Sequence, residues 1–283
     1  MAPERLGLYP KMSGIVARVS KFNARPAPYA DVLKLQDRLH ALVKADGPTA
    51  STSTSTSTST SLHHHVLVLQ HAHTYTVGKR GREDLDFKHT RSELATLMKP
   101  APSIVRVPRG GETTYHGPGQ LVVYPIVDLR RLRLGPRAFV ESLEDAMVDA
   151  AGEYGVEARG RVPGKTGVWV GDRKIGAIGV AISGGVSRHG LAFNVAPALE
   201  AFSHIVACGE EEAKVTSLER ETGRGLDLDD VGARLTARVL ERLYRHCEVR
   251  VEEVGDVWEV MREYGVGSVG SVGGGSGGGG GGR

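Results

Sequence analysis

Residues 109–120 read RGGETTYHGPGQ and separate two apolar runs, at residues 104–107 and 121–127. Both runs have the length and composition of buried strands. The connection carries four glycines, at positions 110, 111, 117 and 119, whereas a tight hairpin turn needs about two. Glycine lets a backbone approach a ligand closely, and Arg109 and His116 add donors for an oxygen-rich group. The stretch therefore predicts a wall of a binding site; composition alone leaves a long surface loop as the alternative.

The overall composition favours one globular domain. The chain has 283 residues, is 40% hydrophobic and carries a formal net charge of +3, which is enough for one sizeable core. Lysine and arginine are scattered and only 5% of the residues are aromatic, so no nucleic-acid partner is expected. The mild positive charge suits an acidic protein partner. Two cysteines make no disulfide framework and fit a reducing compartment. No apolar run approaches the ~18 residues of a membrane span, so no membrane partner is expected.

Low-complexity segments divide the chain. Residues 1–12 form a short N-terminal segment, a candidate targeting sequence that is brief for that role. Residues 51–61 alternate serine and threonine without an apolar face, which predicts a disordered insertion at 47–62. The Gly-rich end predicts a disordered tail at 263–283. A single catalytic domain is expected over residues 13–262.

Periodicity predicts mixed secondary structure. Helices are expected at 30–45, at 136–152 after Pro136, and through residue 245, capped by Asp229 or Asp230. Strands are expected at 15–19, 66–69, 168–170, 174–182, 191–195 and finally 249–251. Because strands outnumber helices and do not alternate regularly with them, the pattern predicts an α+β fold with mixed β-sheets flanked by helices.

Four further segments carry candidate chemistry. They read KIGAIGV at 174–180, HGLAFNV at 189–195, HIVACG at 204–209 and VTSL at 215–218. In this order and spacing, the chain from about residue 15 to residue 251 resembles the lipoyl(octanoyl) transferase family, in its eukaryotic organellar form. Any one segment alone would be a weak signal, and the agreement of all four is specific. The resemblance implies a fold similar to the catalytic domain of biotin and lipoate protein ligases.

The resemblance assigns Cys208 and Lys174 as the catalytic pair. A lone cysteine is otherwise more often an inert buried side chain, and Lys174, after a turn-like segment, is otherwise a solvated hairpin lysine. An ammonium close to a thiol favours the thiolate, and lowering a thiol pKa by one or two units takes about 1.4 to 2.7 kcal/mol. Cys247 lacks such a context and is expected to be structural.

The implied reaction moves an octanoyl group from octanoyl-acyl carrier protein, through a Cys208 thioester, to a lysine of lipoyl-domain proteins. Glycine cleavage H protein and the E2 subunits of 2-oxoacid dehydrogenases are the implied acceptors. Lys174 exchanges the protons, and the kinetic order is ping-pong. No cofactor or metal is needed, because the thioester is already activated. The family's eukaryotic members imply a mitochondrial location, with a plastid as the alternative.

The family's substrate contacts map onto three segments. The residues are Arg109, Gly110, Gly111, Glu112, Thr113, Thr114, Tyr115 and His116, then Ala177, Ile178 and Gly179, then Gly190, Leu191 and Ala192. The glycines are expected to leave room for an acyl chain between apolar walls, although residues 174–182 could be simply a buried strand. His116 is either a packed histidine or an orienting donor near the thioester, and the second is preferred. His189 is expected to support the Cys208 loop, and Thr216 or Ser217 to cap the helix that follows.

Three positions depart from the family pattern. Ala207 replaces a proline, Gln70 replaces an acidic residue, and Phe193 replaces a leucine, which is expected to narrow the pocket. Rival functions are an ATP-dependent lipoate or biotin ligase, a silent acyl-carrier-binding module, and a metal-binding protein. The metal hypothesis rests on His63, His64, His65, His71 and His73, of which the first three are expected to lie in a solvated insertion.

Overall fold

The computed structural model describes residues 12–46, 62–206 and 214–267. The predicted N-terminal segment, the Ser/Thr insertion and the Gly-rich tail therefore lie almost entirely outside the described residues, as does Cys208. The described chain continues past the expected end of the domain at residue 262, and Val266 still packs into the core.

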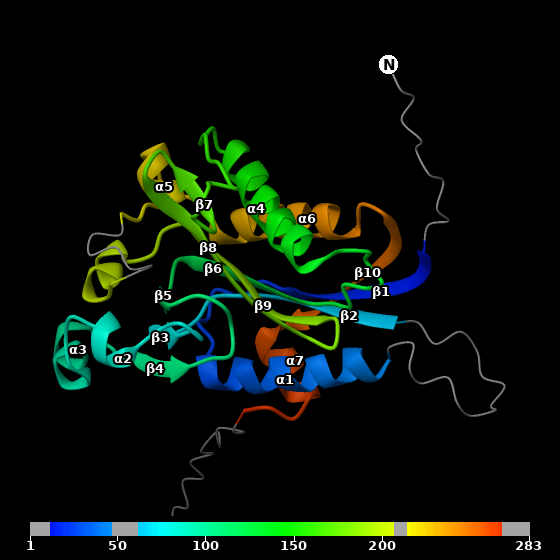
Figure 1. Ribbon diagram of the computed structural model, residues 1–283, viewed down its shortest axis with the longest axis horizontal. Helices are drawn as coiled ribbons and strands as arrows, with labels where there is room; N and C mark the ends of the chain where they lie inside the picture. The colour runs from blue at the N-terminus through cyan, green and yellow to red at the C-terminus, as the bar shows by residue number, and fades with distance from the viewer. Residues whose placement is uncertain (1–11, 47–61, 207–213, 268–283) are drawn as a thin grey trace, which may run out of the picture.

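A seven-stranded mixed sheet forms the centre of the molecule (Figure 1). Its strand order is β10 (Cys247–Asp256), β1 (Met12–Lys21), β2 (Leu62–Leu69), β6 (Gln120–Ile126), β9 (Val186–Asn194), β8 (Arg173–Ser183) and β7 (Val168–Val170). The pairings of β1 with β10 and β2 are parallel, whereas those from β2 to β7 are antiparallel. The parallel edge and antiparallel remainder confirm the expected mixed α+β architecture.

A second, three-stranded sheet lies beside the first. Its order is β4 (Ser103–Arg106), β3 (Thr74–Val77) and β5 (Thr113–His116). The short helices α2 (Glu83–Asp86) and α3 (Arg91–Leu97) flank it, and the 3₁₀ helix η2 (Leu199–His204) packs on β5 (Figure 1). Tyr75 and Tyr115 lie at the centre of its small apolar cluster.

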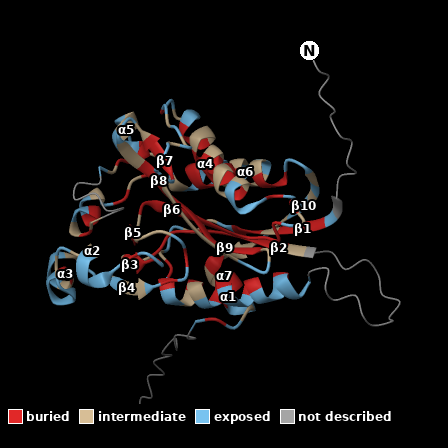
Figure 2. Cartoon of the chain, viewed as in Figure 1, coloured by how far each residue is buried: buried red, intermediate tan, exposed pale blue. Residues whose placement is uncertain are grey.

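Helices cover both faces of the large sheet. On one face lie α4 (Pro136–Gly152) and α6 (Leu228–Tyr244), with the short α5 (Leu218–Thr222) at one end (Figure 1). On the other face lie α1 (Tyr29–Ala45) and α7 (Val257–Glu263). The strands alternate accordingly: Leu121 and Val123 of β6 face α4 and α6, whereas Val122 and Tyr124 face α1 and α7. Figure 2 shows the sheet as the buried layer between the helices.

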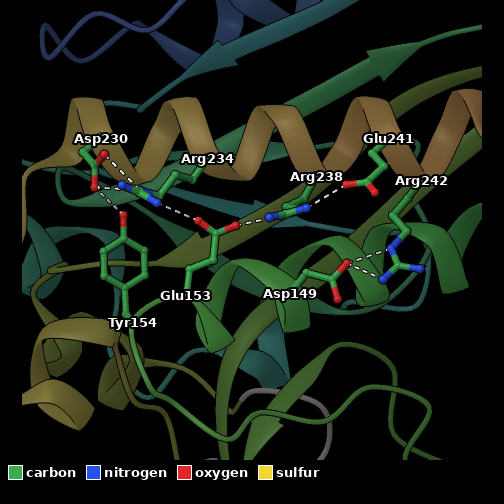
Figure 3. Close-up of polar contacts among 8 residues, drawn as sticks. All are labelled: Asp149, Glu153, Tyr154, Asp230, Arg234, Arg238, Glu241 and Arg242. Atoms are coloured by element: carbon green, nitrogen blue, oxygen red, sulfur yellow. Dashed lines mark hydrogen bonds and ion pairs between the residues drawn. The ribbon is translucent and has the colours of Figure 1, made fainter.

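Ion pairs join the outer surfaces of α4 and α6 (Figure 3). Glu153 accepts from Arg234 at 2.9 Å and from Arg238 at 2.7 Å, and Arg242 binds Asp149 at 2.7 Å. Because these side chains are partly exposed, water screens each pair and its contribution to stability is small. The network therefore sets the alignment of the two helices more than it stabilises the fold.

Several expectations about elements are confirmed and others are wrong. Helix α4 and strand β7 have the predicted bounds. The last helix is α7, not α6, and α6 is capped by Asp227, whose side chain accepts from the Asp229 amide. The predicted buried strand at 104–107 is β4, which is only partly buried because it lies at the edge of the small sheet. The N-cap of α5 is Ser217, one of the two predicted caps.

Candidate active site

A cavity of about 620 Å³ lies against residues of both sheets. It is large enough for a small organic ligand or an extended acyl chain. Its lining includes 13 of the 14 predicted substrate-contact residues, namely Arg109, Gly110, Gly111, Glu112, Thr113, Thr114, His116, Ala177, Ile178, Gly179, Gly190, Leu191 and Ala192. Lys174 of β8 lines the same cavity. The fold thus brings together three segments that are far apart in the sequence.

Tyr115 is the predicted contact residue that does not line the cavity. Its side chain is fully buried in the small sheet, and its hydroxyl lies 2.6 Å from Nδ1 of His73. Successive residues of a strand point to opposite faces, so His116 and Thr114 face the cavity while Tyr115 between them faces the core. Tyr115 supports the wall from behind.

Arg109 holds the glycine-rich loop in place. Its Nη1 donates to the carbonyls of Gly110 and Glu112, at 3.0 and 2.9 Å, and its Nη2 donates to the carbonyl and hydroxyl of Thr76, at 2.8 and 2.6 Å. The Gly110 amide also donates to the Val180 carbonyl of β8 at 3.0 Å. The guanidinium was expected to donate to a substrate oxygen, but these donors go to protein oxygens. Its structural role is to tie the loop to β3.

Two predicted site glycines make room for protein atoms. A Cβ at Gly179 would lie 2.6 Å from Cδ of Arg109, and one at Gly190 would lie 2.2 Å from the Val123 carbonyl oxygen. The two glycines face each other across β8 and β9. The prediction that the missing side chains of these glycines leave space for an acyl chain is therefore wrong, because Arg109 and the backbone of β6 occupy that space.

Lys174 lies between backbone and aromatic contacts. Its amide donates to the Lys214 carbonyl at 2.8 Å, and its own carbonyl accepts from the Thr216 amide at 2.9 Å. Its Nζ lies 5.1 Å from the ring centroid of Trp169, within the range of a cation–π contact. Gly167 has φ of +109°, and a Cβ there would lie 2.8 Å from Cε of Lys174. The same Cβ would lie 2.4 Å from the Gly176 carbonyl oxygen, so the positive φ and this backbone contact require a glycine at position 167, and the lysine chain passes beside it.

Glu144 of α4 fixes the loop that carries Gly167. Its carboxylate accepts from the Gly167 amide at 2.8 Å and from the Arg161 amide at 3.0 Å. Residues 163–166 of this loop line the cavity near Lys174. A buried carboxylate that accepts two backbone hydrogen bonds orders a loop that has no regular secondary structure of its own.

Neutral histidines line the other part of the cavity. Burial, followed by the charge of Arg109, lowers the pKa of His116 to about 4. Burial also lowers the pKa of His189 to about 3, and the charges of Arg109 and Arg188 act in the same direction. His116 lies 2.7 Å from Gln120 Oε1. Neither ring nitrogen of His189 has a hydrogen-bond partner among the residues that the structure describes.

The structure describes one of the two cysteines, Cys247. Cys208 lies outside the described residues, but Phe202 and Lys214, on either side of its segment, both line the cavity. Cys247 is half-buried at the start of β10, its Sγ lies 3.6 Å from the Arg131 carbonyl, and burial raises the pKa of its thiol. These contacts agree with the structural role predicted for Cys247.

Residues 28–240 match the model of the lipoyl protein ligase A/B catalytic domain. The chain belongs to this family. A relative named octanoyltransferase from Geobacter sp. (strain M21) is 37% identical over 218 residues, covering 77% of this chain and 94% of that protein. "Octanoyltransferase LIP2, mitochondrial" of Arabidopsis thaliana is 48% identical over 158 residues, covering 56% of this chain and 66% of that protein. A Solibacter usitatus octanoyltransferase is 53% identical, and the chain spans 57% of its length. These matches identify the chain as a member of the octanoyltransferases, which are acyltransferases.

Solved structures of the family show the same fold. A lipoate-protein ligase A bound with ATP has a TM-score of 0.62 at 15% identity, with 88% of this chain and 94% of that chain covered. The two-part lipoate protein ligase of Thermoplasma acidophilum has a TM-score of 0.59 at 15% identity, with 88% and 91% covered. At these identities the likeness concerns the fold alone, and it confirms the expected similarity to lipoate ligases.

Two of the three departures from the octanoyltransferase pattern have structural explanations, and the third, Ala207, lies outside the described residues. Phe193 does not line the cavity but packs under α4 and α6, so the expectation that it narrows the pocket is wrong. Gln70 accepts from the Gly119 amide at 2.8 Å and donates to the Ala24 carbonyl. An acidic residue could make only the first of these bonds, so the amide here ties the loop of Gly119 to the chain before α1.

The histidine-rich segment is structural. His64 and His65 lie in β2 and are buried, so the prediction of a solvated insertion is wrong for them. Within the described ranges, no three histidine, cysteine, aspartate or glutamate side chains are grouped as metal ligands would be. None of the helices in those ranges combines the length and apolar character needed to cross a bilayer.

Sequence reasoning missed part of the site. The missed lining residues are Tyr29, Arg80, Gln120, Tyr124, Val140, Pro163, Gly164, Lys165, Thr166, Trp169, Gly176, Val180, His189, Asn194, Phe202, Lys214 and Val215. Gln120 and Asn194 stand inside motifs that were noted, so a search for amides next to predicted site segments would have found them. Tyr29 and Trp169 carry no such local signal.

Proposed function

We propose that this chain transfers the octanoyl group of octanoyl-acyl carrier protein to a lysine of lipoyl-domain proteins, through a thioester on Cys208. The observation that carries the proposal is the position of Lys174 in a cavity lined by the substrate segments of the octanoyltransferases. The described residues that flank the segment of Cys208 are Val206 and Lys214, and the carbonyl of Lys214 accepts from the Lys174 amide. That constraint supports a pairing of Cys208 with Lys174.

The first half-reaction acylates the enzyme. The Cys208 thiolate attacks the thioester carbonyl carbon, and the bond from that carbon to the sulfur of the phosphopantetheine arm breaks. Lys174 donates a proton to the departing thiolate, so a thiol leaves. The ring of Trp169 lies 5.1 Å from Nζ and can hold the ammonium group in place by a cation–π contact.

The second half-reaction forms the amide. The amine of the target lysine attacks the acyl-enzyme, the carbon–sulfur bond to Cys208 breaks, and neutral Lys174 takes the proton that the amine loses. The thiolate and ammonium are then restored. No nucleotide enters either step, because the energy of the thioester drives both.

The cavity offers apolar surface for the acyl chain. Ala177, Ile178, Leu191 and Ala192 provide it from β8 and β9. Burying methylene groups at about 0.8 kcal/mol each gives an octanoyl chain several kcal/mol of binding free energy. The lipoyl-domain acceptors proposed are glycine cleavage H protein and the E2 subunits. The mitochondrial name of the Arabidopsis relative supports a mitochondrial location.

The decisive experiment is intact-protein mass spectrometry after the enzyme is mixed with octanoyl-acyl carrier protein in the absence of ATP. We expect an adduct of one octanoyl group that hydroxylamine removes, absent in Cys208→Ser and retained in the matched control Cys247→Ser. The adduct should then pass to a lipoyl-domain lysine. Modification that occurs only with ATP and free octanoic acid would instead establish a ligase, and carrier binding without any adduct would establish a silent binding module.

A further inference from the structure

A chain of hydrogen bonds with a fixed direction ends at His116. The Thr216 carbonyl accepts from Asn194 Nδ2 at 3.0 Å, so Asn194 Oδ1 is the atom that accepts from Gln120 Nε2, at 3.0 Å. Gln120 Nε2 also faces the Tyr115 carbonyl at 3.3 Å. Gln120 Oε1 therefore faces Nδ1 of His116, at 2.7 Å. Because an amide oxygen only accepts, His116 Nδ1 carries the proton.

The tautomer leaves an acceptor at the cavity. In a neutral imidazole one nitrogen is protonated and the other holds a lone pair, so the lone pair of His116 is on Nε2. The ring lines the cavity, and Nε2 has no hydrogen-bond partner within the described part of the chain. The expectation that His116 is an orienting donor is therefore replaced: at neutral pH this nitrogen accepts.

A second directed chain ends next to it. The Ala27 carbonyl accepts from His71 Nδ1 at 3.2 Å, so His71 Nε2 accepts from the Tyr124 hydroxyl at 2.9 Å. The Tyr124 proton is thus committed to His71. The oxygen of Tyr29 keeps a lone pair. The Tyr29 ring stacks on His116 with centroids 5.8 Å apart, and both residues line the cavity.

The charges around these acceptors select a neutral donor. Burial raises the pKa of Tyr29 and lowers that of His116, and the charge of Arg109 lies close enough to oppose the first effect and to add to the second. Glu112 is the one acidic residue among the lining residues described. An ammonium group would thus meet a cation without a nearby buried carboxylate. An uncharged N–H meets no such repulsion.

His189 adds an unpartnered polar group to the same wall. It is 1% exposed, lies T-shaped against Tyr124 at 6.1 Å, and has no hydrogen-bond partner for either nitrogen among the described residues. A buried polar atom without a hydrogen-bond partner has a free-energy cost. A hydrogen-bonding ligand group in this part of the cavity would reduce that cost.

We propose that His116 Nε2, with the Tyr29 oxygen beside it, accepts a hydrogen bond from an uncharged N–H of the substrate and positions it for transfer. This inference rests on the proposed function, because that function names the substrates. That function supplies two sources of the group: an amide N–H of the pantetheine arm of the donor, and the neutral amine of the target lysine.

The first test reads the tautomer directly, by ¹⁵N NMR of protein labelled at histidine. We expect the His116 signals of an Nδ1–H tautomer at neutral pH, and a mixture of tautomers in Gln120→Met, where the accepting amide is gone. Addition of S-octyl-pantetheine, a thioether that cannot transfer its chain, should move the Nε2 signal if the arm is the source. An Nε2–H tautomer in the wild type would overturn the proposal.

The second test separates the two sources by single-turnover kinetics. His116→Phe keeps the ring stack on Tyr29 but has no acceptor. His64→Phe is the matched control, because His64 is equally buried but lies beside Tyr244, away from the cavity. We compare acylation by octanoyl-pantetheine and by S-ethyl thiooctanoate, which lacks an amide, and then aminolysis of the acyl-enzyme by a lipoyl domain.

The expected loss in His116→Phe is about 10- to 100-fold in one step, as for a buried donor that has lost its acceptor. A loss confined to octanoyl-pantetheine assigns the arm amide, and a loss confined to aminolysis assigns the lysine amine. Losses no greater than those of His64→Phe in every step overturn the proposal. If the wild type forms no acyl-enzyme, the proposed function is refuted. The tautomer found by NMR, and the response of the Nε2 signal to S-octyl-pantetheine, would still decide whether His116 Nε2 is an acceptor.

Discussion

Acid should destabilise this protein through its buried histidines, and His64 gives the clearest case. Its side chain lies in the middle of the large sheet and is 0% exposed. The Asp128 amide donates to Nε2 at 3.2 Å, so Nδ1 carries the proton toward the Tyr244 hydroxyl at 3.0 Å. Protonation at Nε2 would place two donors face to face. Burial lowers the pKa of His64 from 6.5 to about 4, against a smaller opposing effect of the Asp128 charge.

The magnitude follows from proton linkage. The unfolded chain binds a proton at His64 below pH 6.5, whereas the folded chain does so only below a pKa of about 4. Between these values the unfolded state binds more protons, so the free energy of unfolding falls as the pH falls. At pH 5, about 1.5 units below the unfolded pKa, the loss is about 2 kcal/mol relative to pH 7. Below pH 4 the contribution of His64 levels off.

The assay is urea unfolding of the wild type and His64→Gln at pH 7 and pH 5. The variant loses stability at both pH values, but its drop between them should be about 2 kcal/mol smaller than that of the wild type. His246→Gln, at an exposed position, is the matched control. An equal drop in wild type and His64→Gln would refute the reasoning, because His64 would then not be neutral and buried in the folded protein.

Three further predictions concern the surroundings of Lys174. Gly167→Ala should lower the acylation rate by about 10-fold or more because the methyl group meets the Gly176 carbonyl of β8 and the Lys174 chain beside it; Gly155→Ala, also at positive φ but in open space, should cost only stability, and equal rates for the two variants would contradict this. Trp169→Leu should lower acylation about 5-fold while Trp169→Phe retains most of it, since the ring face is what Nζ meets; equal losses would exclude the cation–π role. Glu144→Gln should weaken the loop of Gly167 and increase its amide hydrogen exchange, and unchanged exchange would show that the carboxylate does not order it.

Element types followed from local patterns in the chain. Pro136 pre-sets the first turn of α4, and the apolar positions from Phe139 to Ala150 repeat at helical spacing, so the predicted bounds agree with the structure. The strands around residues 168–170 and 174–182 could be predicted because each is an apolar run that follows a turn. These signals depend on neighbours within a few residues, which is why the sequence contains them.

Burial was harder to predict where composition misleads. A run of three histidines next to a Ser/Thr tract looks solvated, yet β2 pairs with β1 on one side and β6 on the other, so His64 is enclosed. In the same way, residues 104–107 look like a buried strand, but β4 lies at a sheet edge. The position of a strand in a sheet depends on the strands that pair with it, and these cannot be identified from the local sequence.

The sequence by itself determined the three long helices, most of the strands, the family and the segments that line the cavity, because periodicity, turn residues and motif spacing are local properties. Only the tertiary structure decided which polar atoms are already used and which are left for a ligand. Arg109 bonds to Thr76, and His116 receives its tautomer from Gln120, Asn194 and Thr216, partners up to 100 residues away in sequence. Hydrogen bonds between distant segments exist only once the sheets have assembled. The direction of each donor, and with it the chemistry that the cavity presents, is therefore a property of the fold.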